Sequence, residues 1–240
     1  MSWQGRNLSV DILTSAAGIA QQILVRSEEG WVLVDVGDGA LRDLLTRGYD
    51  PACLRGILIT HGHFDHMGGL HSLLGFLRMI GRAEPLDICA PPGCTEVVSA
   101  VNGFISCYAD SIPFQIRRVE IDNGDSIYLA GLDIVAHAVV HCGSIDGGEI
   151  LPPIPANGYR ITRKGECVAI SGDTGDCPAV RQLVAGADLA IIEATYASEA
   201  DVDPRMTTCV HLTEALASQI GQTAGEYILA HRVQKHPNEA

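Results

Sequence analysis

With 240 residues, of which 47% are hydrophobic and 19% charged, the chain can bury a large core, and this composition excludes an intrinsically disordered protein. Its formal net charge of −13 at pH 7 argues against a broad nucleic-acid-binding surface, which normally carries a basic stripe. No apolar run is long enough to span a membrane, so we expect no membrane partner. No linker or internal repeat divides the chain, and we predict a single domain over residues 1–240.

The eight cysteines form neither a C-x-x-C pair nor a zinc-finger spacing. The first residues of the chain contain no apolar segment of the kind found in a signal peptide. We therefore expect reduced thiols and a cytoplasmic location, because disulfides are rare in the cytosol.

Apolar periodicity and turn residues predict an interleaved series of strands and helices. In chain order we expect strands over residues 8–13, 18–26 and 30–36, a helix over 40–47, a strand over 56–60, a helix over 70–80, a strand over 86–90, a helix over 95–105, strands over 116–121, 126–129, 132–140, 159–162 and 167–170, a helix beginning near 211 and a last strand over 226–230. The helix over 70–80 should bury one apolar face, because five apolar residues recur there at helical spacing. These residues are Leu70, Leu73, Leu74, Leu77 and Ile80. The glycine- and proline-rich residues 143–158 should form a loop, and the whole pattern favours a mixed α/β sandwich.

The sequence H-G-H-F-D-H at residues 61–66 directly follows the predicted strand over 56–60. Side chains alternate along an extended chain, so His61 and His63 are expected to lie on the same side. Asp65 and His66 follow where the chain must turn toward the next helix. Imidazole and carboxylate are ligand types that Zn²⁺ accepts and that also suit Mn²⁺ and Fe²⁺. The segment can therefore offer two imidazoles to one metal ion, and a carboxylate with an imidazole to a second.

This H-x-H-x-D-H motif after a buried strand resembles the signature of the metallo-β-lactamase superfamily. The resemblance implies an α/β fold, an αββα sandwich of two mixed β-sheets flanked by helices, with a binuclear metal centre at one edge. It also implies two divalent metal ions as cofactors, with Zn²⁺ first and Mn²⁺ or Fe²⁺ as alternatives. Two such ions lower the pKa of a bridging water toward neutrality and supply a hydroxide nucleophile.

A third histidine ligand is expected near the end of the strand over 132–140. His137 and His141 are four residues apart and face the same way in a strand, and only one of them is needed. We prefer His141, because it lies at the strand end, where the superfamily also has its third histidine.

Two further residues complete the implied ligand set. Asp173, in G-D-T-G after an apolar strand, resembles the bridging aspartate of the superfamily. Such a bridge holds two cations about 3.5–4 Å apart, as two-metal hydrolysis requires. His231 follows the last predicted strand and matches the last histidine. The first predicted metal site comprises His61, His63, His141 and Asp173, and the second comprises Asp65, His66, His231 and Asp173. As a ligand, Asp65 would also polarise the water.

Several further segments resemble the ribonuclease Z and zinc phosphodiesterase branch of the superfamily. They are L-V-D-V-G-D-G at 33–39, P-L-D-I-C-A-P-P-G at 85–93, G-Y-R-I at 158–161, I-E-A-T-Y at 192–196 and H-L-T at 211–213. The resemblance implies that Glu193 orients His211, and that His211 stabilises the transition-state phosphate or protonates the leaving oxygen. A departing alkoxide needs an acid, and a carboxylate partner fixes the tautomer of a histidine and raises its basicity.

Three features depart from ribonuclease Z. Phe64 stands where glycine is usual, and Arg232-Val233 follow His231 in place of the usual H-x-S. The segment over 159–173 is too short for the long basic arm that grips transfer RNA in the bacterial enzymes. Together with the acidic net charge, these departures disfavour tRNA and favour a small-molecule or short phosphodiester substrate.

We therefore predict a metal-dependent hydrolase, most specifically a phosphodiesterase that uses a metal-bridging hydroxide. Three alternatives stay open. They are hydrolysis of another bond at the same site (a sulfate ester, lactone, thioester or β-lactam), tRNA 3′-end endonuclease activity, and a non-catalytic sensor that retains the fold. The presence of all seven candidate ligands argues against the sensor. The sequence is also compatible with a homodimer.

Overall fold

The structure is a computed structural model that describes residues 1–142, 145–146, 149–150, 152–202 and 211–234. Among these residues, no helix has both the length and the apolar character needed to cross a bilayer.

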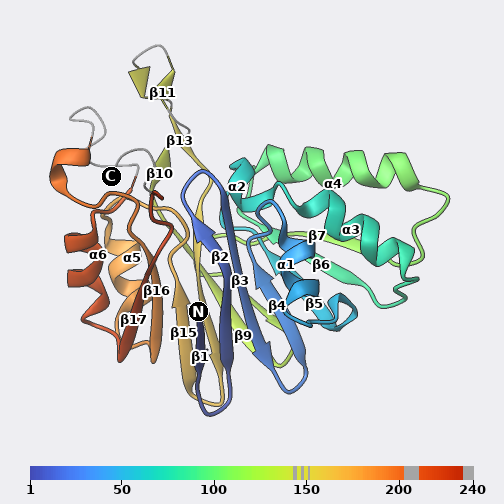
Figure 1. The fold of residues 1–240 in the computed structure, drawn as a ribbon, viewed down its shortest axis with the longest axis horizontal. Coiled ribbons are helices and arrows are strands. Elements are labelled where there is room, and N and C mark those ends of the chain that lie inside the picture. Colours follow the sequence, from blue (N-terminus) through green and yellow to red (C-terminus); the bar gives the residue numbers. More distant parts are fainter. Residues whose placement is uncertain (143–144, 147–148, 151, 203–210, 235–240) are drawn as a thin grey trace.

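Two β-sheets pack face to face, and helices cover the outer side of each (Figure 1). Within the described residues, the first sheet has seven strands in sequence order, β1 (Ser2–Gln4), β2 (Ser9–Ala16), β3 (Ala20–Ser27), β4 (Gly30–Val34), β5 (Leu54–Leu58), β6 (Leu86–Ala90) and β7 (Ile116–Glu120). The second sheet, within the same residues, has six strands in the order β17 (Glu226–Ala230), β16 (Leu189–Glu193), β15 (Glu166–Ile170), β14 (Asn157–Arg163), β9 (Leu132–Ala138) and β8 (Ser126–Leu129).

The helices divide between the two sheets. The first sheet is covered by α1 (Ala40–Thr46), α2 (Phe64–Met67), α3 (Leu70–Met79) and α4 (Thr95–Tyr108), and the second by α5 (Pro178–Val184) and α6 (Glu214–Gly221). Two 3-10 turns, η1 (Pro51–Cys53) and η2 (Glu199–Asp201), and four short strands, β10 (His141–Cys142), β11 (Ile145–Asp146), β12 (Glu149–Ile150) and β13 (Pro153–Ile154), complete the described elements. The predicted αββα sandwich of two mixed sheets is therefore confirmed.

Each sheet contains a parallel part. Strands β4, β5, β6 and β7 run parallel to one another, as do β15, β16 and β17, whereas the remaining neighbours in each sheet are antiparallel. Parallel strands place their carboxyl ends at the same edge of a sheet. The segments that follow β5, β9, β15 and β17 carry the predicted metal ligands, and β9 runs in the same direction as β15, so both sheets present these ligands at one edge of the sandwich.

The core is divided into layers by the two sheets. Side chains such as Val34 and Leu58 from the first sheet and Ile134 and Ile191 from the second pack together between the sheets. The predicted apolar face of α3 packs on the outer side of the first sheet, and four of its five residues are buried. Ile80 is the exception, because it caps the helix and is 44% exposed. The single-domain organisation over residues 1–240 stays a prediction.

Several elements differ from the expected ones: helix α5 and strand β16 were not predicted, and the ends of other elements shift by up to three residues. A short first strand, β1, precedes the predicted ones and pairs antiparallel with β2. Helix α4 continues through Gly103 to Tyr108, because the neighbouring Val101 and Phe104 are buried in the core and hold this part of the helix in place. The expected loop over 143–158 contains three short strands: β11 pairs antiparallel with β12, and β13 pairs antiparallel with β10. β11 and β13 project from the sandwich (Figure 1).

A buried carboxylate ties the N-terminal segment to the second sheet. Glu166, in β15, accepts backbone N–H hydrogen bonds from Arg6 (2.7 Å), Asn7 (2.6 Å) and Leu8 (2.9 Å). Burial by itself would raise the pKa of Glu166, but these three donors hold its pKa below the ordinary value. The carboxylate therefore satisfies three backbone donors just before β2 begins.

We expect Glu166→Gln to lower the free energy of unfolding at pH 7 by about 2 kcal/mol, because an amide cannot accept all three N–H groups. Because the folded-state pKa of Glu166 is lowered, the carboxylate adds its full stabilisation to the folded protein above its unfolded-state pKa, near 4.5. This stabilisation is lost as the pH falls through the lower folded-state pKa. Urea unfolding at pH 7 and below pH 4.5 measures both effects, and the difference between the two proteins should shrink in acid.

The matched control is Glu120→Gln, since Glu120 is exposed and accepts one N–H, from Gly93. It should change the unfolding free energy little. A difference between wild type and Glu166→Gln that is independent of pH would contradict the charge-assisted role of this carboxylate.

Candidate metal centre

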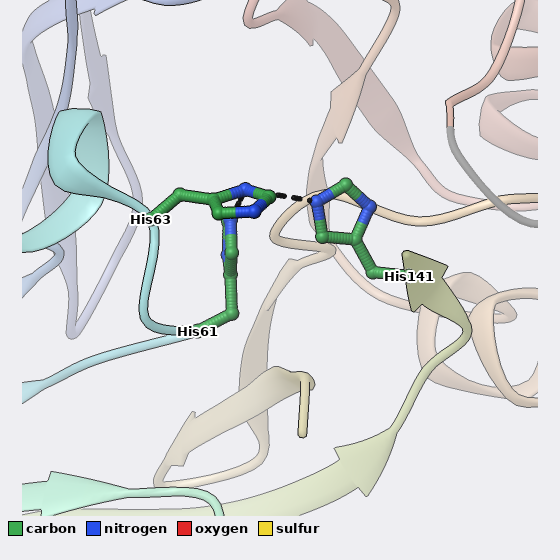
Figure 2. A group of neighbouring side chains, drawn as sticks. All are labelled: His61, His63 and His141. Carbon is green, nitrogen blue, oxygen red and sulfur yellow. Dashed lines mark hydrogen bonds between the residues drawn. The ribbon is translucent and has the colours of Figure 1, made fainter. Parts of the chain in front are cut away.

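The first cluster of histidines joins the two sheets. His61 and His63 follow β5, and His141 begins β10 after β9 of the second sheet. Figure 2 shows the three rings converging, with Nε2 of His61 3.0 Å from Nδ1 of His63, and Nε2 of His141 3.2 Å from the same atom. Two ligands of one tetrahedral zinc ion lie about 3.3 Å apart, so these separations fit a shared cation.

The second cluster contains Asp65, His66 and His231, all of them buried. Nε2 of His66 lies 3.2 Å from Nε2 of His231, which lies 3.2 Å from Oδ2 of Asp65. Oδ2 of Asp65 is 3.8 Å from Nε2 of His66. One carboxylate and two imidazole nitrogens thus converge on a second small volume.

Asp173 lies between the two clusters and is 2% exposed. Its Oδ2 is 3.4 Å from Nε2 of His66 and 3.9 Å from Nε2 of His61, and its Oδ1 is 3.3 Å from Nδ1 of His231. Within the described residues, the buried Oδ1 has no hydrogen-bond partner. Such an unsatisfied buried oxygen, surrounded by imidazole nitrogens, fits a divalent cation as its missing partner.

A glycine allows Asp173 to reach this position. Gly172 has a φ of +61°, which disfavours other residues, and a Cβ there would lie 2.8 Å from Cβ of Thr60. The backbone after β15 can therefore approach the end of β5 closely, which brings Asp173 to the histidines.

The electrostatics of the clusters follow from burial and mutual charge. Burial by itself would raise the pKa of Asp173, but His231 and His66 hold it well below its ordinary value. Burial lowers the pKa of His66, but Asp173 and Asp35 together raise it well above the ordinary value. Burial and the neighbouring His66 lower the pKa of His61 well below its ordinary value. Without a cation, the centre therefore combines an ionised Asp173, a neutral His61 and a protonated His66, and His66 would release its proton when a metal ion binds.

Asp35 was not assigned a role from the sequence, yet it supports the second cluster. Its Oδ2 lies 2.8 Å from Nδ1 of His66, and its Oδ1 accepts the backbone N–H of Thr60 at 2.8 Å. Asp35 is fully buried and follows β4, the parallel neighbour of β5. The only sequence signal that could have identified Asp35 was its position as an acidic residue at the end of a predicted buried strand. The structure adds that this strand end lies beside the motif.

The β2–β3 hairpin supports the same cluster from the other side. Gly18 donates its N–H to Oδ2 of Asp65 at 2.8 Å, and the hydroxyl of Ser15 accepts the N–H of His231 at 2.7 Å. Thr195 Oγ1 lies 3.0 Å from Nδ1 of His231. These contacts orient the side chains and hold the left-handed backbone of His231, whose φ is +53°.

Glu193 and His211 form a pair beside the clusters. Nδ1 of His211 lies 3.0 Å from Oε1 of Glu193, which also accepts the N–H groups of Thr174 and Leu212 at 3.1 Å. Burial lowers the pKa of His211, but the Glu193 carboxylate outweighs this and raises it to about 9. His211 lies near the centre, since its Nδ1 is 3.9 Å from Oδ2 of Asp173. The pair can hold a proton next to Asp173.

The structure thus brings all nine predicted site residues together. His137 lies apart from them in β9, half-buried and opposite Gly158 of β14, so its position agrees with the preference for His141. The sequence reasoning missed Asp35, Thr195 and Ser15, which contact the predicted ligands without being among them. The assignment of the nine residues as ligands and catalytic groups stays a prediction.

Comparisons with known proteins agree with this geometry. The family model of the β-lactamase superfamily domain matches residues 30–231. A ribonuclease Z of Bradyrhizobium sp. (strain ORS 278) is 27% identical over 257 residues, which cover 90% of this chain and 85% of the relative.

Two solved structures share the fold. Human tRNase Z, short form, superposes with a TM-score of 0.76 at 22% identity, covering 98% of this chain and 93% of the other. A diphosphatase from the PhnP family superposes with a TM-score of 0.70 at 19% identity, covering 100% and 91%. Because the family model spans every residue of the two clusters and the curated relatives carry the names of ribonuclease Z and ribonuclease BN, the chain belongs to the β-lactamase superfamily and resembles its ribonuclease Z branch.

Proposed function

We propose that this protein is a binuclear metal-dependent phosphodiesterase. The observation that carries the proposal is the position of Asp173 between two clusters of ligand atoms, with the Glu193–His211 pair beside it. The relative named ribonuclease Z indicates the same class of bond, since a ribonuclease cleaves phosphodiesters. The nature of the cations, with Zn²⁺ preferred, and a homodimeric state stay predictions.

The donor set divides into two groups that fit a pair of cations. His61, His63 and His141 would hold one, and Asp65, His66 and His231 the other, with Asp173 shared between them. Two divalent cations bound there would neutralise the charge of a phosphate and lower the pKa of a nearby water molecule. Asp35, Ser15 and Gly18 restrict the ligand orientations before any metal binds, which reduces the cost of assembling the centre.

Hydrolysis of a phosphodiester forms a bond from a water oxygen to phosphorus and breaks the bond from phosphorus to the leaving oxygen, which must receive a proton. His211 is suited to donate that proton, because Glu193 keeps its imidazole protonated near neutral pH. Glu193 is itself fixed by the N–H groups of Thr174, Leu212 and Thr195. The acid is therefore held in place rather than free to rotate.

The Glu193–His211 pair disfavours a thioester, because a thiolate departs without a proton whereas the alkoxide that leaves a phosphodiester requires one. A lactone and a β-lactam also need a proton, and the relative named ribonuclease Z favours the diester over them. The tRNA endonuclease alternative is supported by the name of the relative, but the sequence after His141 disfavours RNA. Residues 143–156 contain Asp146 and Glu149 and no lysine or arginine.

We expect Asp65→Ala to abolish metal-dependent hydrolysis of bis-(p-nitrophenyl) phosphate, because Asp65 would be a ligand of the second cation. The assay uses protein reconstituted with Zn²⁺ or Mn²⁺, and circular dichroism checks the fold. Asp133→Ala is the control, since Asp133 is an exposed aspartate of β9. Unchanged turnover in Asp65→Ala would refute the proposed centre, and no turnover in the metal-loaded wild type would redirect the search to sulfate esters, lactones and thioesters.

We expect Asp35→Asn to weaken binding of the second cation about 10–100-fold, because an amide holds the His66 imidazole less firmly than a carboxylate does. Competition with a metal chelator measures the affinity without an activity assay. Asp87→Asn is a matched control, since Asp87 is also largely buried but pairs with Arg117. Equal affinities in Asp35→Asn and wild type would show that Asp35 has no part in positioning His66.

We expect His211→Ala to slow diester hydrolysis about 10²–10⁴-fold when the leaving group is a poor one such as phenoxide. The loss should be much smaller with p-nitrophenoxide, which departs without a proton. Glu193→Gln should show the same leaving-group dependence to a lesser degree, because it acts through His211. Equal losses for both leaving groups would assign His211 to stabilising the transition-state phosphate, and no loss would exclude it from the chemistry.

A further inference from the structure

Large exposed hydrophobic side chains occur in the segments that carry or contact the candidate metal ligands. Four of the ten exposed large hydrophobic residues in the described part of the chain belong to segments that carry or contact the proposed ligands. These four, which we name the apolar rim, are Ile19 (51% exposed), Phe64 (67%), Val140 (38%) and Val233 (60%). Single exposed hydrophobic residues are common on proteins, but four of them in the segments of one candidate site favour a role in binding.

Each rim residue is tied to the centre through the backbone. Phe64 stands between His63 and Asp65 at the start of α2. Ile19 follows Gly18, whose N–H binds Asp65. Val140 precedes His141, and its carbonyl accepts the N–H of Gly175, two residues after Asp173.

The fourth rim residue, Val233, lines a pocket on the side of the Glu193–His211 pair. The pocket has a volume of about 330 Å³, and its wall includes Thr195, Tyr196 and Val233. Thr195 Oγ1 lies 3.2 Å from Nδ1 of His211, and the ring of Tyr196 packs edge-on against the ring of His211 with centroids 5.7 Å apart. The apolar surface therefore extends to the side from which His211 would protonate a leaving group.

The charges around the rim disfavour a polyanion. Asp201 and Glu214 also stand in the wall of that pocket. Arg232, which follows His231, is paired with Glu214 at 2.9 Å. A second arginine, Arg181, is paired with an aspartate three residues after Asp173, at 2.8 Å. A substrate with several phosphates would meet these carboxylates and gain little from cations that are already neutralised.

We propose that the substrate is a small phosphodiester with a single phosphate and an aromatic or other apolar ester group, and that Phe64 determines this preference by packing against that group. This inference rests on the proposed function, because it assumes that the phosphate lies at the centre. A single negative charge enters the proposed cation site, while the uncharged ester group covers apolar surface that is otherwise exposed to water. Phe64 is a specificity-determining residue in this scheme, since it offers the largest and most exposed face of the rim.

The test compares methyl p-nitrophenyl phosphate with phenyl p-nitrophenyl phosphate, which share a leaving group and differ only in the retained ester. For the Zn²⁺-loaded wild type we expect kcat/KM, divided by the uncatalysed rate, to be at least about tenfold higher for the phenyl ester. In Phe64→Ala this ratio should fall about tenfold, and Phe64→Leu should restore part of it. Tyr128→Ala is the control, because Tyr128 is 64% exposed in β8, away from the ligand segments, and should leave the ratio unchanged.

Binding gives a readout that does not depend on turnover. Diphenyl phosphate should bind the Zn²⁺-loaded wild type about tenfold more tightly than dimethyl phosphate in calorimetry, and Phe64→Ala should abolish this preference. Turnover of both diesters with a ratio near one, insensitive to Phe64, would overturn the inference and leave the proposed function standing. Absent turnover with a Phe64-dependent binding preference would refute the phosphodiesterase and support the apolar recognition. Absence of both would refute both.

Discussion

The buried carboxylate of Asp173 is the group on which the rest of the centre depends. An isolated charge at a site that is 2% exposed is costly, and it persists only where opposite charges or hydrogen-bond donors compensate it. Here the compensation comes from histidines of both sheets, with His66 from the first and His231 from the second. The carboxylate therefore links the electrostatics of the site to the packing of the two sheets.

Because the ligands come from both sheets, the geometry of the centre is set by the core between them. Residues such as Leu58 and Ile191 fill that core. They lie at or near the ends of β5 and β16, shortly before the segments that carry the site residues. The residues that orient the ligands also come from both sheets. Asp35 and the β2–β3 hairpin lie in the first sheet, and Thr195 follows β16 of the second. Such a rigid surrounding is what a site needs if its ligands are to keep their separation when the ions bind.

The polar centre and the apolar rim divide the recognition of a substrate into two parts. The centre would select a phosphate through charge, which many phosphodiesters satisfy equally. The groups at the mouth then discriminate between them, and Phe64 and Val233 present uncharged surface where a ribonuclease would need cations. When the residues around a preserved centre change, the same fold can act on different substrates.

Whether a feature of the fold or of the candidate site could be predicted depends on whether the contacts that form it join residues close together in the sequence. The apolar face of α3 and strand β6 were predicted correctly, because the spacing of apolar residues along the chain is itself the structural signal. The boundary errors fell where packing outweighs local preference. Gly103 lies inside a helix that its neighbours sustain, and Ile80 lies beyond the last buried turn of α3.

By itself, the sequence determined the types of the candidate ligands, their order along the chain and the strands after which they stand. Only the tertiary structure decided that Asp35 would face His66, that Ser15 and Gly18 would contact the second cluster, and that the segments bearing four exposed apolar residues would meet at one centre. The physical reason is that these contacts join residues far apart in the chain. Which of them meet depends on how the strand ends align and how the two sheets pack, and no local spacing encodes that alignment.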